Sequence, residues 1–406
     1  MPGLPALCLR PRDVRRGAVL TLVFLAAVGA GACTGSWDHA APGQSPGPAA
    51  LMAATEPAAA PPGPRAPARA PREAATADRD AVARAAAEAV AEGKSAKSAA
   101  QDVVSRSGDR WAAVYDQGEY EAFADDLAGQ WTGVGLWAGR QRDGRIEIDR
   151  VQPGSPAARA GMRAGDRLLS IDGQGVTGLG VAEVVSLLRG EAGTPVQLKL
   201  TRGGTDLTQT VRREKLRSEP VTVRELPGGI TVIKVASFTK GSGDRVRSAV
   251  RAAPAGGGVM LDLRGNTGGL VTEAVTAASA FLDGGLVATY DVRGAQRALY
   301  AAPGGDTARP LVALIDGGTM SAAELVTGAL QDRGRAVAVG TRSFGKGSVQ
   351  MPTELPDGSV AELTVGTYRT PAGRSLDGAG ITPDLAAADR VEERARTVLS
   401  GIGVGP

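Results

Sequence analysis

The sequence predicts an α/β multidomain protein in which a helical arm and a small strand-rich module precede a larger α/β core. Three observations lead to this expectation. The Ala-rich stretch 79–104 places apolar residues at helical spacing. Between residues 132 and 204, short Gly-flanked apolar runs indicate strands joined by turns. From residue 205 onward, apolar strand-like runs alternate with helical ones, which is the pattern of a layered α/β fold.

Composition narrows the chemistry that this chain can perform. Its 406 residues include one His, His39, and two Cys, Cys8 and Cys33. The sequence after residue 39 therefore excludes His-based catalytic triads, cysteine nucleophiles, zinc sites built on His or Cys, and internal disulfides. Residues 1–33 account for the whole formal charge of +3, so the remainder is formally neutral. A neutral body is a poor match for nucleic acid, and no nucleic-acid partner is expected.

The amino terminus has the pattern of an export signal. A basic stretch ends at Arg16, an apolar run fills residues 17–32, and Cys33 follows. This run is short for a bilayer-spanning helix, which needs about 20 residues, and it ends in small residues, as secretory leaders do. The same cut would expose Cys33 for lipidation, as in bacterial lipoproteins, although Ala30 stands where Leu is usual. We therefore expect residues 1–33 to be a leader. The mature chain would then be either a lipoprotein attached to the extracytoplasmic face of the membrane through Cys33 or a secreted protein.

Two segments separate this leader from the strand-rich module. Residues 34–76 are rich in Ala, Pro and Gly, which predicts a solvated spacer. Residues 77–131 form the predicted helical region, with one or two helices within 79–104. This region could also mediate a homodimer.

The segment 132–204 alternates strands and turns with two helices. Residues 145–151 alternate apolar and polar side chains, so they predict a half-buried strand. A short helix is expected over residues 157–160, an amphipathic helix over 181–190, and a closing strand over 194–202.

This segment resembles a PDZ domain of the bacterial type. The resemblance rests on the stretches GVGL, GSPAARAGMRAGD, IDG and LLRGEAGTPV. It implies that the module binds an extended carboxy-terminal peptide by strand addition, with the backbone of Val134, Gly135 and Leu136 capturing the terminal carboxylate. Apolar residues of the 181–190 helix would line the groove or fill the module's core, and for Leu188 the core is at least as good an interpretation.

In the carboxy-terminal half, buried strands are predicted over 258–265, 310–316 and 336–340, with helices over 269–282 and 321–334. Two of these helices begin at polar or glycine-rich turns, one at Gly268-Gly269 and the other at Ser321. Helix starts present free amides and the positive end of the helix dipole, which suit a developing oxyanion. On local sequence alone, a helix N-cap is the commoner role for a serine in such a place.

The segment 340–350, GTRSFGKGSVQ, contains a notable lysine. It nearly matches a phosphate-binding loop, but Gly347 stands where Ser or Thr is needed and a strand follows, so no nucleotide site is expected. Only seven of the 46 basic residues are lysines. A retained Lys346 suggests a need for a cation that can lose its proton. Because no His is available, Ser321 and Lys346 form the leading nucleophile–base pair, with an exposed loop lysine as the alternative.

The carboxy-terminal half resembles the C-terminal processing peptidases, also called tail-specific proteases. The resemblance rests on GVMLDLRGNTGGLVTEAV, SAAELVTGALQDRGRAVAVGTRSFGKGSVQ and YRTPAGRSLDGAGITPD. It implies a PDZ domain inserted before a crotonase-like ββα serine protease core at 205–390, with a carboxy-terminal helix and tail at 391–406. No cofactor is expected.

The resemblance also implies roles for individual residues. Ser321 would be the nucleophile, Lys346, 25 positions later, the general base and then acid, and Gln350, four further on, would orient the lysine. Backbone amides of Gly268 (or Gly269) and Ala322 would form the oxyanion hole.

Two departures from the family's pattern, Met320 before the nucleophile and Thr267 before the paired glycines, remove no catalytic group. The expected function is therefore an exported serine endopeptidase that cleaves protein substrates near their free carboxy termini. Arg189 is expected to take part in coupling the PDZ domain to the active site. The alternatives are a catalytically idle PDZ peptide-binding envelope protein and a purely structural envelope protein.

Overall fold

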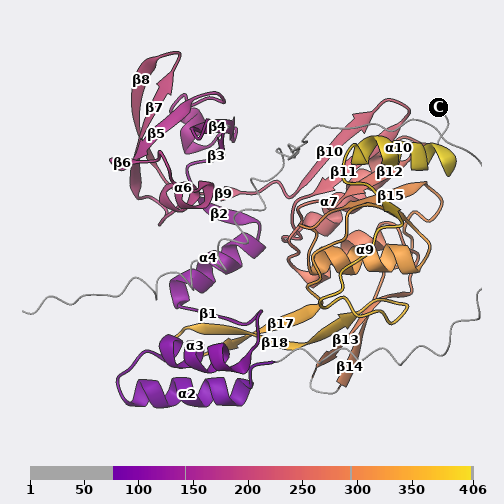
Figure 1. Cartoon of the computed structure of the whole chain (residues 1–406), viewed down its shortest axis with the longest axis horizontal. Coiled ribbons are helices and arrows are strands. Elements are labelled where there is room, and N and C mark those ends of the chain that lie inside the picture. Colours follow the sequence, from indigo (N-terminus) through magenta and orange to yellow (C-terminus); the bar gives the residue numbers. More distant parts are fainter. Residues whose placement is uncertain (1–75, 142, 293–294, 404–406) are drawn as a thin grey trace, which may run out of the picture.

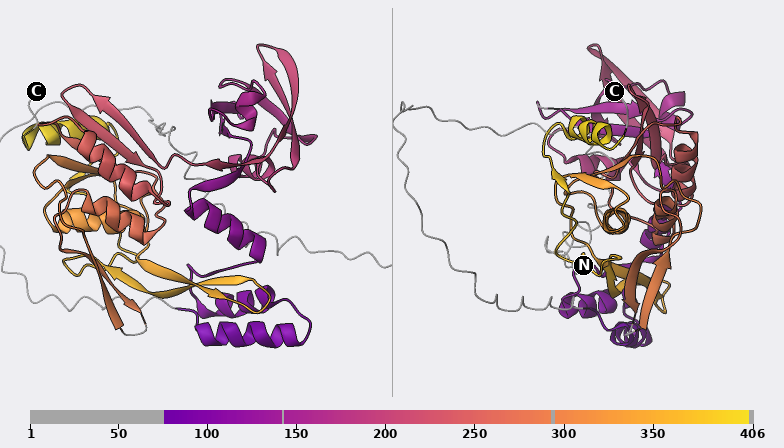
Figure 2. Two further views of the ribbon diagram at one scale, coloured as in Figure 1. Left: turned by 180° about the vertical axis from the view of Figure 1, so that it is seen from behind. Right: turned by 90° about the vertical axis from the view of Figure 1, so that its right-hand side faces the viewer.

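The computed structural model describes residues 76–403, except residues 142 and 293–294. The predicted leader with Cys33, and all but the last residue of the predicted spacer, lie outside these residues. In the described part, no helix is both long enough and apolar enough to cross a bilayer. Figures 1 and 2 show a helical arm (α2 and α3) at one end of the carboxy-terminal half, and a strand-rich module (β3 to β8) that stands apart from that half.

The amino-terminal arm is a pair of helices, α2 (Arg79–Ala91) and α3 (Ala96–Ser107), as the Ala-rich pattern predicts. Asp78 and Ser95 cap the two amino termini, because their side chains accept hydrogen bonds from the first-turn amides. The small apolar residues of both helices pack against the hairpin of strands β17 (Ser348–Glu354) and β18 (Val360–Arg369). The arm therefore rests on the part of the fold that follows Lys346.

The chain then enters and leaves the strand-rich module through one connection. A short strand β1 (Ala113–Tyr115) leads into helix α4 (Gln117–Leu127), which begins at a capping box formed by Asp116 and Glu119. Strand β2 (Gln130–Gly133) pairs with β9 (Glu214–Arg217), so the incoming and outgoing chains run side by side (Figure 1).

The module itself is a sheet in the order β3-β4-β5-β7-β8, with β6 paired to β5. Its elements are β3 (Leu136–Arg140), β4 (Ile146–Val151), α5 (Pro156–Arg159), β5 (Arg167–Ile171), β6 (Gln174–Gly175), α6 (Val181–Leu188), β7 (Pro195–Arg202) and β8 (Thr205–Arg212). The sheet thus continues past residue 204, where the sequence placed the module's end. Alternate residues of the strands fill one apolar core beneath α6, including Ile148, Leu168 and Leu198.

The carboxy-terminal half is built on a six-stranded sheet in the order β10-β11-β12-β15-β16-β19. Its strands are β10 (Val221–Leu226), β11 (Ile230–Val235), β12 (Val259–Asp262), β15 (Leu311–Ile315), β16 (Val337–Gly340) and β19 (Leu385–Ala386). Only the edge strand β10 runs antiparallel to its neighbour. The alternation of strands and helices in the sequence is thus confirmed as a mainly parallel, layered fold.

Helices cover both faces of this sheet, which is why its central strands β12 and β15 are buried throughout and mainly apolar. Helices α7 (Ser242–Ala252), α8 (Val271–Ser279) and α9 (Ala322–Asp332) pack on one face, where Ile233 and Leu261 point. Helix α10 (Val391–Gly401) packs on the other face, against Val232 and Met260 (Figure 1).

A second, antiparallel sheet joins this core to the arm. Its order is β1-β18-β13-β14, and β17 also pairs with β18. A turn at Asp357-Gly358, with Gly358 at φ 81°, joins β17 and β18 into an antiparallel hairpin. Strands β13 (Leu286–Val292) and β14 (Ala295–Tyr300) have no counterpart in the sequence prediction.

Candidate active site

Ser321 stands at a sharp turn between strand β15 and helix α9. Its φ is 54° and its ψ is −119°, a combination that costs energy for a residue with a side chain. Such strain is concentrated at functional sites, and a tight strand-to-helix turn presents its side chain outward. The Ser321 hydroxyl makes no capping hydrogen bond to α9. Ser321 thus occupies the N-cap position of α9 without using its hydroxyl as the cap.

Hydrogen bonds from the neighbouring loop hold this turn in place. The amide of Met320 donates to the carbonyl of Asn266 at 2.8 Å. The buried hydroxyl of Thr319 donates to the carbonyl of Leu263 at 2.9 Å. The carboxylate of Asp316 accepts the amide of Gly265 at 2.9 Å. The loops that follow β12 and β15 thus form one unit at the carboxyl ends of adjacent parallel strands.

The carboxylate of Glu324, in the first turn of α9, connects the backbone of Ser321 to the segment 343–346. Glu324 is completely buried. One of its oxygens, Oε2, accepts the amides of both Ser321 and Lys346 at 2.9 Å. The other, Oε1, accepts the Ser343 hydroxyl at 2.5 Å and the Gly345 amide at 2.7 Å. Four hydrogen bonds compensate the burial of this charge, and they fix the Ser321 and Lys346 backbones relative to each other.

Lys346 is half-buried in the segment between β16 and β17. Burial lowers the pKa of its ammonium below the ordinary value, while Glu362, Asp109 and Glu324 act in the opposite direction. Within the described residues, its Nζ has neither a hydrogen-bond partner nor an ion-pair partner. A desolvated amine without a counter-ion favours the neutral form, so Lys346 meets the electrostatic requirement for a base.

Ser321 Oγ and Lys346 Nζ are not hydrogen bonded to each other in this structure, as far as the described residues show. Catalytic hydrogen bonds are often open without substrate and shorten in the complex. Glu324 accepts the backbone amides of both residues and so holds their backbones relative to each other.

The side chain of Gln350 forms hydrogen bonds with residues other than Lys346. Its side-chain nitrogen donates to the hydroxyls of Ser348 at 2.7 Å and Thr364 at 3.3 Å. The Thr364 hydroxyl in turn donates to Asp109 at 2.9 Å. No hydrogen bond joins Gln350 to Lys346 in the part of the chain that the structure covers. The role of Gln350 in orienting Lys346 stays a prediction.

The glycine pair after β12, Gly268 and Gly269, lies beside Ser321. A Cβ on Gly268 would stand 3.0 Å from the Ser321 Cβ and 3.2 Å from the Ala322 amide nitrogen, so only glycine allows this approach. The Gly268 amide donates to the side chain of Asn266 at 2.8 Å. Among the described residues, the amides of Gly269 and Ala322 donate to no acceptor. The role of Gly268 in an oxyanion hole stays a prediction, and Gly269 and Ala322 have the free amides.

In the module, the predicted carboxylate-binding residues form the turn into β3. Val134 and Leu136 are buried, and Gly135 has φ 84° with no room for a Cβ beside Ser155. On α6, Val184 and Leu188 belong to the module's core, whereas Val185 is half-buried. The structure therefore favours the core interpretation for Leu188.

Arg189 follows α6 and connects the module to the linking helix. Its guanidinium lies 3.2 Å from the Asp126 carboxylate on α4. Its centre also lies 5.8 Å from the centre of the Trp131 ring. Burial raises the pKa of Asp126, and Arg189 opposes that shift. The predicted role of Arg189 in coupling is untested by these contacts.

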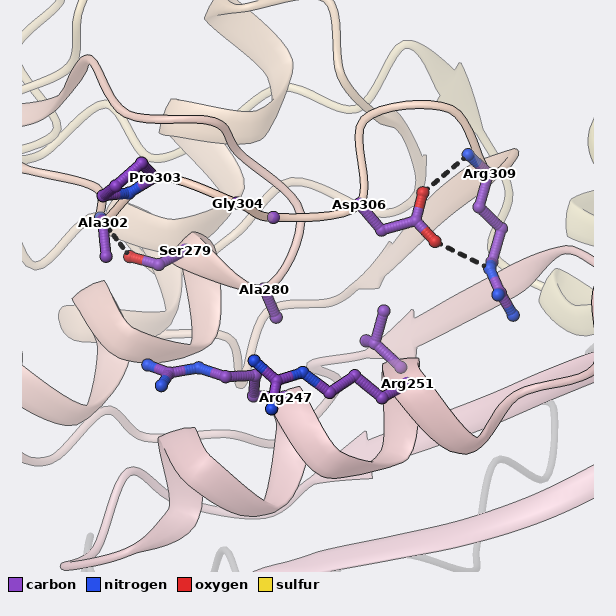
Figure 3. A pocket seen from close by; sticks show the side chains of 11 residues that line it. Arg247, Arg251, Ser279, Ala280, Ala302, Pro303, Gly304, Asp306 and Arg309 are labelled. Atoms are coloured by element: carbon purple, nitrogen blue, oxygen red, sulfur yellow. Dashed lines mark hydrogen bonds and ion pairs between the residues drawn. The ribbon is translucent and has the colours of Figure 1, made fainter.

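A separate cavity of about 240 Å³ lies between α7 and the loop 302–309 (Figure 3). Its lining includes Arg247 and Arg251 from α7, and Arg309, which is paired with Asp306 at 3.0 Å. None of the candidate catalytic residues lines it. This cavity is therefore not the place where Ser321 or Lys346 would meet a substrate.

Two family models match the chain. The peptidase family S41 model matches residues 229–387, and a PDZ domain model matches residues 147–202. The chain belongs to the S41 peptidase family. This S41 membership confirms the predicted family and fold class, a PDZ domain before an α/β protease core with amino-terminal helices.

Similar proteins carry names that agree with this family. The carboxy-terminal processing protease CtpA of Bacillus subtilis (strain 168) is 31% identical over 299 residues, which cover 72% of this chain and 64% of that protein. The carboxy-terminal-processing protease of Bartonella bacilliformis is 34% identical over 281 residues, 66% of this chain and 64% of that protein. The chain thus spans less than two thirds of the length of these relatives. Among solved structures, the photosystem II D1 C-terminal processing protease is 30% identical, with a TM-score of 0.49, and the match covers 75% of this chain and 86% of that one.

Glu324 was not predicted as a site residue, although the sequence contains a capping-box pattern at Ser321 and Glu324. A Glu three residues after a Ser at a helix start is the mark of a capping box. The reciprocal half of that box, from the Glu324 carboxylate to the Ser321 amide, is formed here. The bonds from Glu324 to Gly345 and Lys346 depend on tertiary folding and leave no local pattern in the sequence.

Replacing Glu324 with Gln should impair the reactivity of Ser321. An amide side chain retains one acceptor oxygen but turns a donor toward the other two donors, so the junction between Ser321 and Lys346 should loosen. We expect labelling of Ser321 by a fluorophosphonate, which modifies activated serines, to slow about 100-fold. The free energy of unfolding should fall by about 2–4 kcal/mol.

Glu273→Gln is the matched control. Glu273 also accepts two backbone amides, those of Gly241 and Gly243 at 2.8 and 2.9 Å, but it joins α7 to α8. The Glu273→Gln variant should have a lower free energy of unfolding, while its rate of Ser321 labelling stays within about threefold of wild type. Equal labelling of the two variants would show that Glu324 is only a structural group.

Proposed function

We propose that this chain is an exported serine endopeptidase that cleaves protein substrates near their carboxy termini with Ser321 as nucleophile and Lys346 as base. The observation that carries the proposal is the junction at Glu324, which holds a strained serine with a free hydroxyl beside the segment of a desolvated lysine. S41 membership supports the same activity.

The reaction follows from the groups at this junction. Neutral Lys346 accepts the proton of the Ser321 hydroxyl as Oγ attacks the scissile carbonyl carbon. The carbonyl oxygen takes the negative charge and is stabilised by the free amides of Ala322 and Gly269 and by the positive end of α9. The Lys346 ammonium then gives its proton to the departing amine, which leaves an acyl ester on Ser321.

Hydrolysis of that ester repeats the same steps with water. Lys346, neutral again, takes a proton from a water molecule as the oxygen of that water attacks the ester carbon. The proton then returns to Ser321 Oγ, and the carboxylic acid product leaves. The cycle needs a lysine that can be neutral near physiological pH, which agrees with the lowered pKa of Lys346.

The PDZ domain would supply the preference for carboxy termini. Strand addition beside β3 would align the last residues of a substrate, and the Val134–Leu136 turn would hold the terminal carboxylate. The ion pair between Arg189 and Asp126 gives this module a polar contact with the helix that leads back to the arm.

We further propose that the mature chain acts outside the cytoplasm, as a lipoprotein attached through Cys33. The basic, apolar and small-residue order of residues 1–33 supports this location. The mass of the mature amino-terminal peptide tests it, since an unmodified Cys33 or an uncleaved leader would contradict lipidation. A homodimer through the helical arm is a further proposal that sedimentation analysis can test.

Removing the nucleophile should abolish cleavage. Residues 34–406 would be incubated with an unfolded protein that ends in apolar residues, and the fragments would be read by mass spectrometry. We expect Ser321→Ala and Lys346→Ala to lose at least about 1,000-fold in rate, because neither half of the pair acts alone. Cleavage by Ser321→Ala at the wild-type rate would sink the proposal. A folded wild-type chain that binds such substrates without cutting them would favour the idle PDZ-binding protein instead.

The carboxylate preference can be tested with one chemical change in the substrate. A peptide that spans a cleavage site and ends in a free carboxylate should have a lower KM than the same peptide with an amidated terminus, by about tenfold, with a smaller effect on kcat. The internal control is a substrate too short to reach the PDZ domain, for which amidation should change nothing. Equal KM values for the long pair would contradict capture by the PDZ domain.

A further inference from the structure

The segment between the amino-terminal arm and β1 approaches Lys346 through one aromatic side chain, Trp111. Lys346 Nζ lies 5.1 Å from the centre of the Trp111 ring. The ring of Phe344, two residues before the lysine, lies 5.8 Å from the same indole at an angle of 59°. Trp111 is separated from Lys346 by more than two hundred residues of chain, yet its indole lies against this amine.

Strong local contacts hold Trp111 in this place. Asp109, which is buried, accepts the amides of Trp111 and Ala112, each at 3.1 Å. The same carboxylate accepts the amide and hydroxyl of Thr364 on β18, at 3.2 and 2.9 Å. Strand β1, which follows at once, pairs with β18 in the register Ala113↔Glu362. The segment 109–115 is thus fastened to the hairpin next to the lysine (Figures 1 and 2).

The space between the indole and the amine is poor in polar partners. The indole nitrogen of Trp111 is buried and has no hydrogen-bond partner within the described residues. Lys346 Nζ likewise has none there. The charged groups that act on the amine are Glu362 from β18, Asp109 from the arm and Glu324 from α9. All three favour the ammonium, so the loss of water contact opposes them.

The ring itself could act in either direction. An aromatic face attracts an ammonium, by about 0.5–2 kcal/mol. The guanidinium of Arg110, however, lies 4.8 Å from the centre of the same ring and is permanently charged. Arg110 is also ion-paired with Asp377 at 3.1 Å, so the attraction of the ring is shared between two cations. Loss of water contact is the largest cause acting on the pKa of Lys346, and the covering indole contributes to that loss.

We propose that Trp111 is a positioning residue of the active site, whose indole covers the amine of Lys346 and keeps water away from it. This inference rests on the proposed peptidase function and deepens it, because it makes the docked arm a condition for a neutral base. Release of the arm from β18 would expose Lys346 and switch the base toward its charged, inactive form.

The test is the pH dependence of Ser321 labelling by a fluorophosphonate in the 34–406 chain, from about pH 6 to 10.5. In Trp111→Ala, water reaches the amine, so the rise of the rate with pH should move to higher pH. Labelling at pH 7 should be about tenfold slower than in wild type, and it should recover to within about threefold at the highest pH. Trp111→Phe retains an apolar ring and should keep the wild-type profile. Tyr300→Ala removes an exposed aromatic from β14 of the same half and should also change nothing.

Each other outcome has a definite meaning. A rate that falls equally at every pH would show that Trp111 has only a structural role, and a rise that moves to lower pH would show that attraction of the ammonium dominates. Either result overturns the inference while wild-type labelling, absent in Ser321→Ala, keeps the peptidase proposal intact. If wild type and Ser321→Ala label alike, the proposed function fails, and this inference fails with it. The position of the rise does not depend on the fraction of folded protein, so partial misfolding of Trp111→Ala cannot imitate the expected result.

Discussion

The active site depends on one buried carboxylate. Glu324 accepts four hydrogen bonds, one from the Ser321 turn and three from the segment 343–346, and local sequence cannot build this junction. A buried charge is tolerated only when it is satisfied in this way. The same four bonds hold the turn that strains Ser321 and the segment that carries Lys346. Strain at the nucleophile can persist because the surrounding bonds fix the backbone more firmly than the turn resists.

Around this junction, the fold brings together segments that are distant in the chain. The parallel sheet places the loops after β12 and β15 side by side, which brings Gly268 against Ser321. The hairpin β17–β18 follows Lys346 and receives the helical arm on its outer side. Asp109 and Thr364 are 255 residues apart in sequence and share a buried hydrogen bond. Lys346 thus lies between the core, through Glu324, and the segment that follows the arm, through Trp111.

Much of this arrangement could be predicted from the sequence. The spacing of apolar residues correctly located the strands β12, β15 and β16 and the helices α8 and α9, since burial on both faces imposes long apolar runs. The scarcity of His and Lys directed attention to Ser321 and Lys346. The contacts that position these two residues could not be predicted from the sequence. Gln350 bonds to Ser348 and Thr364, because the register of β17 on β18 decides its partners. Trp111 reaches Lys346 only through the pairing of β1 with β18, and no local pattern announces that pairing.

The proposed mechanism requires Lys346 to be neutral in the folded chain at a pH where an ordinary lysine is charged. Its pKa can be measured directly by NMR on a chain labelled with ¹³C at lysine Cε, because only seven lysines contribute signals. Lys346→Arg identifies the signal by its loss. Burial of Lys346 should make its Cε signal titrate below the ordinary pKa of about 10.4. A Lys346 signal that titrates at or above that value would contradict the account.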